Sequence, residues 1–503
     1  MEKVVLGVDI GTSAVKTIMV NQQGQVLASA NKPITTLHPQ AGFSEQHPDE
    51  WVQATKDTLQ TISEMESMRV VQVEGMSFSG QMHGLVLVDQ YGEAIRPAIL
   101  WNDTRTTEQC EIIKKRLGQY VLGNPVLEGF TLTKMMWVKQ YEPSNWERTY
   151  KFLLPKDYVR FKLTGVLSME VSDASSTLLL DPKTQQWSYD TGALFGIDAQ
   201  IFPDLTSAES YVGNVKPDVA KSLGLNTNIQ VFAGGGDNAC AALGSGVVKP
   251  HDTLCSIGTS GVILTCEANA ASYGQNMHLF QHALPHVSYI MGVTLAAGDS
   301  LAWFQKTLAP ELSFDDILLL AQQSSIGANG LLFTPYLSGE RTPHGDAYIR
   351  GSWIGLSSLH TRSDMARAVI EGISYCLYES ILYLRENGKS LTHITATGGG
   401  AKSDFWLQLQ ADIFNASMRK LSHEEGPSMG AAIIAATGVN WFDSMEACSR
   451  VFVTYDKEFH PDSVNHQQYK RYFDIYRQVY TQSQPLTEQL LMISEARDNE
   501  ITH

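Results

Sequence analysis

The chain opens with alternating stretches of apolar and polar residues. An apolar run predicts a β-strand over residues 4–10, and after a short glycine-containing turn a second apolar run covers residues 15–20. A polar turn at residues 21–25 leads into a third apolar stretch at residues 26–28. Three strands joined by such short turns predict an antiparallel β-meander.

The pattern of this first hairpin recurs about half the chain later. Ile-Gly-Thr-Ser stands at residues 10–13 and again at residues 257–260, an offset of 247 positions in a chain of 503. A strand–turn–strand unit that opens each half predicts a duplicated domain. We therefore expect two domains, residues 1–247 and 248–503, with a C-terminal helix from about residue 462.

Two further glycine clusters each follow a predicted strand and open a predicted helix. Residues 234–236 precede Asp237, and residues 398–400 precede Ala401. Strands and helices therefore alternate, which is typical of an α/β fold. The chain also exceeds the roughly 250–300 residues that one hydrophobic core supports, which agrees with two large domains.

Charge and composition narrow the classes of partner. The 37 Lys and Arg against 53 Asp and Glu give a formal net charge of −16. This argues against nucleic-acid binding, which relies on clustered positive charge. No apolar stretch approaches the roughly 18 residues that span a membrane, and the N-terminus lacks a signal-peptide pattern. We expect a cytoplasmic protein that binds neither nucleic acid nor membrane, with its six scattered cysteines reduced and mostly buried.

The glycine turns favour a site for phosphate. Such turns expose several backbone N–H groups and let phosphate oxygens approach without meeting a Cβ. One turn alone would be weak support, but two matching hairpins and two strand–glycine–helix junctions favour a nucleotide site. A Walker A loop is excluded, because Tyr383 stands where the pattern ending at residues 388–390 needs glycine. The Rossmann fingerprint is also missing after the first strand.

Two carboxylates stand at strand ends beside these turns. Asp9 precedes the first hairpin turn, and Asp237 follows the first triple glycine. A carboxylate in this place can accept a proton from an attacking hydroxyl, and a second can hold a Mg²⁺-bound water. Aspartate next to glycine also commonly caps a turn or a helix. For Asp237 the two interpretations are about equally supported by the residues alone.

The motifs, in this order and spacing, resemble those of the FGGY carbohydrate kinases over essentially the whole chain. They are VDIGTSAVK at residues 8–16, AGGGDN at 233–238, SIGTSG at 256–261, TGGGA at 397–401 and two signature segments at 129–141 and 351–372. The first signature departs only at its end, where Tyr141 replaces a polar residue. The resemblance implies a two-lobed actin/Hsp70-like fold with duplicated ribonuclease-H-like domains.

The resemblance also implies ATP-dependent phosphorylation of a sugar, with Mg²⁺ as the second cofactor. It assigns Asp237 as general base and Asp9 as the residue that positions Mg²⁺ through water, with Asp237 a possible further metal contact. The residues implied to hold the nucleotide are Gly11, Thr12, Ser13, Lys16, Gly258, Thr259, Ser260, Gly398, Gly399, Gly400 and Ala401. A homodimer is a family expectation without a motif in this chain.

Within the family, SGQMHG at residues 79–84 and WNDTR at residues 101–105 are most similar to members that phosphorylate D-xylulose at its 5-hydroxyl. The residues that this similarity places on the sugar are Met82, His83, Trp101, Asn102, Asp103, Arg105, Asp237 and Asn238. From the residues alone, core packing is the better explanation for Met82 and His83, and it is the better explanation for Trp101 as well.

Three alternatives stay open. The sugar could be another member of the family's range, such as gluconate, ribulose, fuculose or a polyol. The protein could be an actin- or Hsp70-like ATP-driven conformational switch, although SGQMHG would then be unexplained. It could also bind a sugar without turnover as a sensor, which the presence of the candidate base Asp237 argues against.

Overall fold

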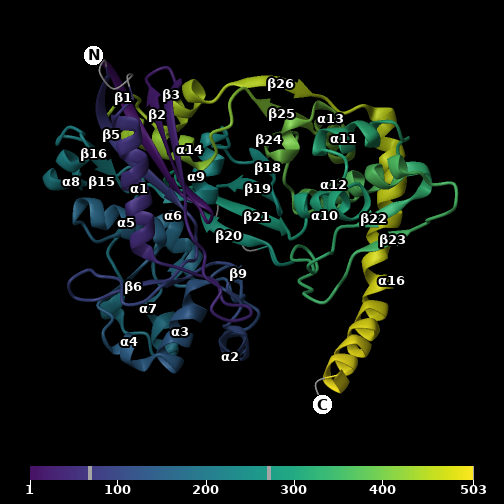
Figure 1. Ribbon diagram of the computed structural model, residues 1–503, viewed down its shortest axis with the longest axis horizontal. Coiled ribbons are helices and arrows are strands. Elements are labelled where there is room, and N and C mark those ends of the chain that lie inside the picture. The colour runs from purple at the N-terminus through teal and green to yellow at the C-terminus, as the bar shows by residue number, and fades with distance from the viewer. Residues whose placement is uncertain (66–70, 269–272, 502–503) are drawn as a thin grey trace.

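The computed structural model describes residues 1–65, 71–268 and 273–501, and it contains two large β-sheets that lie side by side (Figure 1). The first sheet has the order β15-β16-β5-β1-β2-β3, with β17 also paired to β5. Its strands are β1 (Glu2–Ile10), β2 (Ala14–Asn21), β3 (Val26–Pro33), β5 (Val71–Gly80), β15 (Tyr211–Asn214), β16 (Gln230–Phe232) and β17 (Gly235–Gly236). The predicted meander of the first three strands is confirmed.

The second sheet has the order β20-β21-β19-β18-β24-β25-β26. Its strands are β18 (Thr253–Ile257), β19 (Gly261–Glu267), β20 (His278–Gln281), β21 (Ser288–Thr294), β24 (His393–Gly398), β25 (Ser417–Leu421) and β26 (Tyr455–Phe459).

The two sheets share the same core arrangement of strands, to which the second adds β20 at one edge. Strands β18, β19 and β21 form an antiparallel meander like β1, β2 and β3, and β24 lies parallel to β18 as β5 lies parallel to β1. A further parallel strand and an antiparallel edge strand follow in both. Even the register at the turns agrees, since Ile10 pairs with Gly80 and Ile257 with Gly398. The duplicated α/β fold predicted from the repeat is confirmed.

Helices pack on both sheets, as alternating strands and helices require. On the first sheet, α1 packs against β2 and β3, and α14 packs against β1 and β5. On the second, α12 packs against β19 and β21. These helices are α1 (Pro48–Ser63), α9 (Asp237–Gly244), α12 (Arg362–Glu386), α13 (Asp404–Phe414) and α14 (Pro427–Gly438).

Helix α14 belongs to the second half of the sequence but lies on the first sheet. The approach is close enough to require glycine on both sides. A Cβ on Gly7 of β1 would lie 2.1 Å from the carbonyl oxygen of Ser428, and a Cβ on Gly430 would lie 2.0 Å from that of Cys240 in α9. The domain boundary at residues 247 and 248 therefore stays a prediction, because the chain returns to the first sheet well after it.

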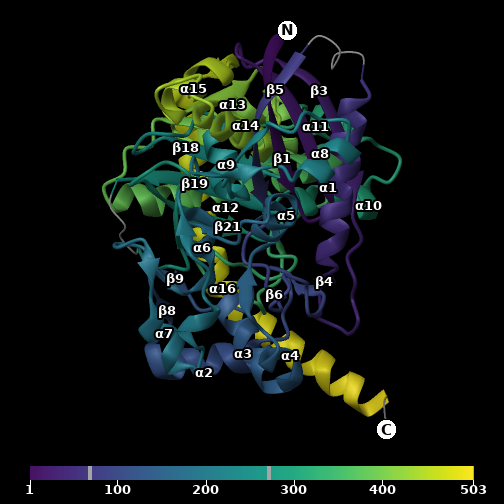
Figure 2. The same ribbon diagram turned by 90° about the vertical axis from the view of Figure 1, so that its left-hand side faces the viewer.

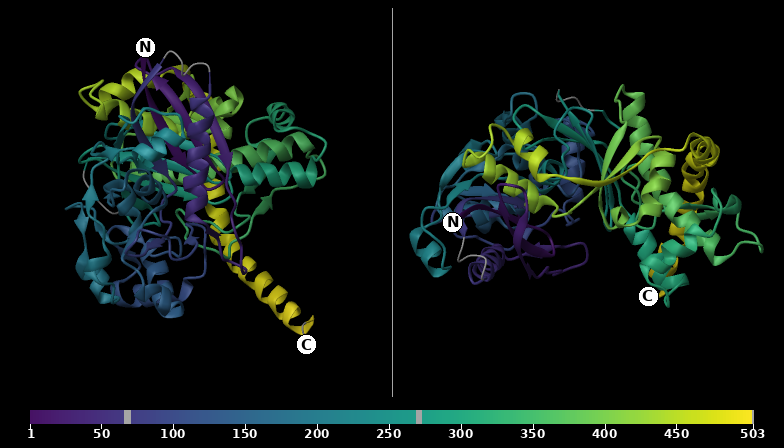
Figure 3. Two further views of the ribbon diagram at one scale, coloured as in Figure 1. Left: turned by 60° about the vertical axis from the view of Figure 1, so that its left-hand side comes forward. Right: turned by 90° about the horizontal axis from the view of Figure 1, so that it is seen from above.

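The C-terminal helix α16 (Ser463–Ile501) begins where the sequence predicts. Tyr469 and Tyr476 are buried, and their ring centroids lie 6.3 and 5.3 Å from that of Tyr375 in α12. The last turns of α16 extend away from the body of the molecule, as Figure 2 and Figure 3 show.

The remaining elements are short, and several of them, among them α2, α3, α4 and α7, gather below the first sheet at the foot of Figure 1 and of Figure 2. The helices are α2 (Thr107–Leu117), α3 (Thr131–Tyr141), α4 (Pro143–Glu147), α5 (Pro155–Thr164), α6 (Val171–Ala174), α7 (Tyr189–Leu194), α8 (Pro217–Ser222), α10 (Gly298–Leu308), α11 (Phe314–Gln322), α15 (Met445–Phe452) and the 3₁₀ turns η2 (Ser175–Thr177), η3 (Ala199–Ile201), η4 (Ala328–Gly330) and η5 (Gly399–Lys402). The strands are β4 (Glu45–Gln46), β6 (Val86–Val88), β7 (Ala98–Ile99), β8 (Tyr120–Val121), β9 (Asn124–Pro125), β10 (Lys151–Leu153), β11 (Met169–Glu170), β12 (Leu180–Asp181), β13 (Gln186–Trp187), β14 (Leu205–Thr206), β22 (Leu332–Thr334) and β23 (Ser352–Ile354).

Two expectations from composition can be compared with this fold. All six cysteines are buried and outside any disulfide. Over the described ranges, none of the helices combines the length and the apolar character needed to cross a bilayer.

Candidate active site

Asp9 and Asp237 meet at the end of one strand. Asp9 lies opposite Ser79 in the pairing of β1 with β5, and Gly235 of β17 lies opposite the same Ser79 on the other side. Because β1 and β17 flank β5 at the same position, the aspartate in β1 and the aspartate that follows β17 come together. The topology of the sheet thus assembles a pair from residues that are 228 positions apart in the sequence.

The two carboxylates act on each other electrostatically. Burial and then the negative charge of Asp9 raise the pKa of Asp237 to about 7. Burial raises the pKa of Asp9 to about 6, although the positive charge of Lys16 pulls it down. Two like charges that are close together and poorly hydrated disfavour each other's ionised form. One of the pair therefore changes its charge near neutral pH, which is the range a general base needs.

Asp237 is not the cap of helix α9. It is the first residue of the helix, Gly236 occupies the cap position, and no side chain caps the helix there. Among the described residues, Oδ1 of Asp237 accepts hydrogen bonds from the backbone and side-chain amides of the next residue alone, Asn238, at 2.7 and 3.0 Å. These bonds orient the carboxylate without satisfying the later amides of the helix. The capping interpretation of Asp237 is therefore wrong.

The site offers oxygen ligands to a cation. Oδ1 of Asp9 is buried, and no described residue donates a hydrogen bond to it. A hard cation such as Mg²⁺ prefers oxygen ligands and is often held by one or two carboxylates together with water and phosphate oxygens. Asp9 and Asp237 fit this pattern. No cluster of three or more His, Cys, Asp or Glu side chains suited to a metal occurs in the described part of the chain, so an all-protein cage is not offered.

The first glycine turn is held by a network of side chains. The carbonyl of Thr12 accepts a hydrogen bond from Gln46 at 2.7 Å, and its hydroxyl donates to Gln81 at 3.3 Å. The indole of Trp101 donates to the same hydroxyl at 3.0 Å. Gln46 gave no signal in the sequence, because it stands 34 residues from Thr12 in an unremarkable polar stretch. Ser13, at the tip of the turn, is exposed.

Lys16 lies in β2 opposite Asp9, as the hairpin register requires. Its ammonium group pairs with the carboxylate of Glu425 at 2.7 Å, in the segment that leads into α14. Lys16 can therefore bind a phosphate only if this ion pair opens or shifts. Together with the position of α14, the pair links the first hairpin to the second half of the chain.

The second glycine turn borders a hollow of about 600 Å³. The predicted residues Gly258, Thr259, Gly399 and Gly400 line it. The start of α10 packs directly on the turn, and a Cβ on Gly298 would lie 2.3 Å from the carbonyl oxygen of Gly258. The predicted residues Ser260, Gly398 and Ala401 do not line the hollow, and the amide of Gly398 is taken by the carboxylate of Glu424 at 2.5 Å.

The opposite wall of this hollow is apolar and was missed by the sequence analysis. It is formed by Leu301 and Ala302 of α10, Phe314 and Leu318 of α11, and Trp406 of α13. A hollow lined both by glycine turns with backbone amides and by apolar side chains suits a nucleotide, whose phosphates need donors and whose base needs apolar contacts. The sequence contained one indication that α10 borders a site. A glycine followed by an aspartate stands at the start of α10, at residues 298 and 299, as it does at residues 236 and 237.

The predicted sugar residues Met82 and His83 lie next to Asp237. The amide of Asn238 and the hydroxyl of Tyr289 both donate to Sδ of Met82, each at 3.6 Å. Nδ1 of His83 lies 2.9 Å from the carbonyl oxygen of Ser176. Burial lowers the pKa of His83 to about 3, so the ring is neutral, Nδ1 carries the proton and Nε2 is left as an acceptor.

The segment at residues 101–105 corrects several expectations. Trp101 is 40% exposed, so it does not fill the core as expected. Asn102 is exposed. Asp103 and Arg105 pair with each other at 2.7 Å, and Arg105 also pairs with Glu45. Because their side chains are buried and their polar atoms are used within the protein, the expectation that Asp103 and Arg105 contact the sugar directly is not supported.

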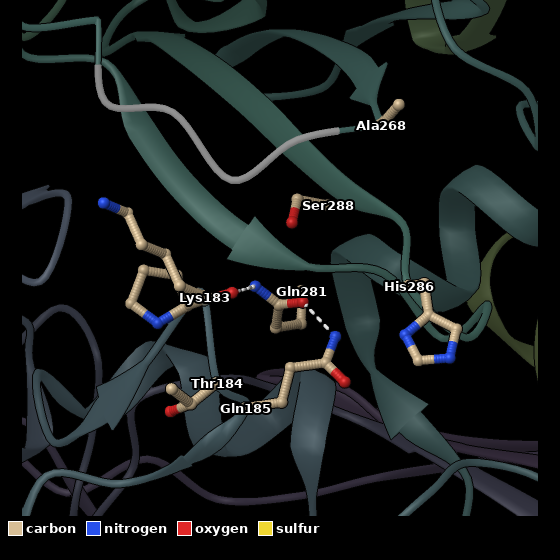
Figure 4. A pocket seen from close by; sticks show the side chains of 8 residues that line it. Lys183, Thr184, Gln185, Ala268, Gln281, His286 and Ser288 are labelled. Atoms are coloured by element: carbon tan, nitrogen blue, oxygen red, sulfur yellow. Dashed lines mark hydrogen bonds between the residues drawn. The ribbon is translucent and has the colours of Figure 1, made fainter.

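A separate polar hollow of about 500 Å³ is lined by other residues (Figure 4). The turn between β12 and β13 forms one side, with Lys183 and Gln185, and the hairpin between β20 and β21 forms the other, with His286 and Ser288. Gln185 donates a hydrogen bond to Gln281 across it at 2.6 Å. None of the residues predicted from the sequence lines this hollow, and its described lining residues include no carboxylate and no nucleotide-binding turn.

Family models match both halves of the chain. The N-terminal domain of the FGGY family of carbohydrate kinases matches residues 4–244, and the C-terminal domain of that family matches residues 253–439. A xylulose kinase of Staphylococcus epidermidis is 53% identical over 495 residues, which cover 98% of this chain and 100% of the relative.

Two solved structures from Lactobacillus acidophilus are similar over almost the whole chain. A ligand-bound xylulose kinase is 26% identical with a TM-score of 0.91, covering 97% of this chain and 100% of the other. A gluconate kinase is also 26% identical with a TM-score of 0.90, covering 96% and 98%. Since the two neighbours act on different sugars, the shared fold does not by itself select the sugar.

Gly258→Val tests the nucleotide site. A Cβ on Gly258 would meet nothing closer than Ser260 O at 3.9 Å, so the fold should tolerate the change. The larger side chain would block phosphate from the backbone amides, and losing hydrogen bonds to a charged group weakens binding by about 10- to 100-fold. Calorimetric titration with an ATP analogue should show this loss with an unchanged melting temperature and unchanged sugar binding. Equal loss of sugar binding in the folded variant would contradict the division between the two sites.

Proposed function

The chain belongs to the FGGY family of carbohydrate kinases, and from this premise we propose that it transfers the γ-phosphoryl group of ATP to the 5-hydroxyl of D-xylulose. The observation that carries the chemistry is the coupled pair of Asp9 and Asp237, which leaves Asp237 with a pKa of about 7. A carboxylate with that pKa is ionised in a useful fraction of molecules and is still basic enough to take a proton at neutral pH.

Asp237 is the general base. Its carboxylate accepts the proton of the attacking hydroxyl as the new oxygen–phosphorus bond forms, and Asn238 holds it in orientation through the bonds to Oδ1. In phosphoryl transfer, positioning and charge neutralisation contribute at least as much as the base. The proximity of Met82 to Asn238 supports a sugar placed with one end at Asp237.

Mg²⁺ is part of the proposal. Asp9 would hold it through its unpaired oxygen or through water, with Asp237 as a second contact, and the ion would neutralise phosphate charge when bound. The turn at residues 11–13 and Lys16 would complete the phosphate end of the site from the first half. Gly258, Thr259, Gly399 and Gly400 bind the rest of the nucleotide from the second half.

D-xylulose is favoured over other sugars by the relative at 53% identity, which is described as a xylulose kinase. A second candidate, gluconate, remains because a gluconate kinase has the same fold at 26% identity. A conformational switch without sugar turnover is disfavoured, because such a switch does not need a general base. Asp237 has the pKa of a base and lies beside the sugar loop, residues 79–84.

ADP release measured by a coupled assay tests the substrate. We expect turnover with D-xylulose to exceed that with D-ribulose, gluconate, glycerol or no sugar by at least about tenfold in kcat/KM, a difference of roughly 1.4 kcal/mol in transition-state binding. Faster turnover of gluconate would reassign the substrate within the family. ADP release independent of any sugar would contradict the kinase proposal itself.

Asp237→Asn separates catalysis from folding. Turnover should fall by about 10²- to 10⁴-fold, because an amide cannot act as the base. The pKa of Asp237 is higher in the folded state than in an unfolded aspartate, so this group stabilises the fold while protonated and the contribution is lost as pH rises from about 4 to 7. Removing the charge should therefore raise the melting temperature at pH 8 and leave it nearly unchanged at pH 4.

Ser444→Ala serves as a control that acts on folding alone, since its hydroxyl accepts a hydrogen bond from the amide of Ala447 at the start of α15. It should lower the melting temperature at both pH values, because loss of an N-cap typically costs about 1 kcal/mol. An Asp237→Asn variant that keeps more than a tenth of wild-type kcat would show that another group is the base.

A further inference from the structure

Arg341 carries a positive charge that the described residues leave without an ion pair or a side-chain hydrogen bond. It lies half-buried in the loop between β22 and β23. Its backbone amide donates to the carboxylate of Glu340 at 2.7 Å, and its carbonyl accepts the amide of Gly345 at 2.6 Å. Glu340 and Glu128 attract it through space, yet burial still lowers the pKa of the guanidinium. Burial also raises the pKa of Glu340 to about 8, so this neighbour is mostly neutral at pH 7. The five N–H donors of Arg341 are therefore free for a ligand.

His278 presents a second unsatisfied group at the same place. The residue is 3% exposed, and neither ring nitrogen has a hydrogen-bond partner among the described residues. Its ring stacks on Phe280 with centroids 5.6 Å apart and lies 5.9 Å from the ring of Phe130. A buried polar atom without a partner lowers the stability of a fold, and such atoms in native proteins usually indicate a missing ligand or water.

Both groups face His83 from the second half of the chain. His83 lies with ring centroids 4.7 Å from Phe130 and 5.6 Å from Phe280, the same two rings that hold His278. The hydroxyl of Thr342, which follows Arg341, donates to the carbonyl of Asn276, two residues before His278, at 3.1 Å. In agreement with this position, the positive charge of Arg341 contributes to lowering the pKa of both histidines.

The positions of Arg341 and His278 are fixed by the backbone around them. Thr342 donates its amide to the carbonyl of Val293 in β21 and accepts the amide of Val293 on its hydroxyl, both at 3.0 Å. Next to His278, Asn124 of the first half exchanges two hydrogen bonds with the backbone of Leu279, at 2.8 and 2.9 Å. Strand β20 is thus docked on the first half, and the two groups are held rigidly beside the sugar loop.

We propose that Arg341 and His278 complete the sugar pocket from the second half of the chain and recognise the keto end of the substrate, remote from the transferred hydroxyl. This inference rests on the proposed function. The contacts run in order from Asp237 through Asn238 and Met82 to His83, and Arg341 and His278 follow at the far end. With the 5-hydroxyl at Asp237, that end receives the carbonyl at carbon 2 and the hydroxyl at carbon 1.

The chemistry of the three side chains suits this end of a ketose. A planar guanidinium donates two hydrogen bonds to one carbonyl or to adjacent oxygens. His83 offers an acceptor at Nε2, and the ring of His278 offers one donor and one acceptor to a hydroxyl. A site built to hydrogen-bond a substrate oxygen rejects an analogue that lacks it, because its own buried groups are then left unpaired.

Arg341→Met in the full-length protein tests the proposal. Steady-state kinetics are measured with D-xylulose and with xylitol, in which the carbon-2 carbonyl is reduced to an alcohol. We expect kcat/KM for D-xylulose to fall about 10- to 100-fold, mostly through KM, with KM for ATP nearly unchanged. The preference for D-xylulose over xylitol should shrink by a similar factor. An unchanged preference, or equal loss for ATP and sugar, would overturn the proposal.

Arg350→Met is the matched control. Arg350 is exposed in the same loop, and its guanidinium already donates to the carbonyls of Ala347 and Ile349. Its variant should keep the wild-type preference for D-xylulose. If Arg341→Met fails to fold, Arg341→Lys is used instead, because it keeps the charge but cannot donate bidentate hydrogen bonds. An intermediate loss of the preference for D-xylulose over xylitol is then expected.

His278→Phe provides the second measurement. It keeps the aromatic packing with Phe130 and Phe280 and removes both unpaired nitrogens, so the melting temperature should stay equal or rise. The kcat/KM for D-xylulose should nevertheless fall several-fold, and unchanged kinetics would show that His278 is a packing residue only. If the wild-type protein prefers another sugar, the proposed substrate is wrong, and the same variants are compared on that sugar and its reduced form. If it turns over no sugar, the proposed function fails first, and calorimetric D-xylulose binding that is equal in wild type and Arg341→Met overturns this inference separately.

Discussion

The active site depends on a pair of carboxylates held together at the end of one buried strand. Asp9 and Asp237 flank the end of β5, where neither is well hydrated and each disfavours the charge of the other. This arrangement lowers the stability of the folded protein. It also gives the site a base that titrates near neutral pH. Every other part of the site is arranged around the two groups.

The two halves of the chain are joined at three places around this pair. Helix α14 reaches back to the first sheet through Gly7 and Gly430, Lys16 pairs with Glu425, and β20 docks on β9. The nucleotide hollow belongs mainly to the second half and the sugar loop to the first, so catalysis needs both halves in register. The same contacts bring Arg341 and His278 of the second half to the far end of the sugar loop. A sugar pocket formed by the first half alone would not explain why these two side chains lack hydrogen-bond partners among the described residues.

Local motifs made much of the fold and of the reacting groups predictable. The repeated glycine turns, the strand that precedes each, and both aspartates stand on contiguous stretches whose geometry follows from a few neighbouring residues. The sequence could not predict that Asp103 and Arg105 are used up by each other and by Glu45, because that pairing brings together separate segments. It also missed the apolar wall at α10 and α11. Arg341 and His278 gave no signal, because nothing local indicates that a buried polar group lacks a partner.

Titration of the aspartate carboxyl carbons by nuclear magnetic resonance tests the central claim most directly. In protein labelled at aspartate Cγ, one carboxyl should titrate near pH 7, and its signal should disappear in Asp237→Asn. In Asp9→Asn the same carboxyl should titrate at lower pH, because the neighbouring negative charge is gone. Titration of every aspartate below about pH 5, close to the ordinary value for this side chain, would contradict the account.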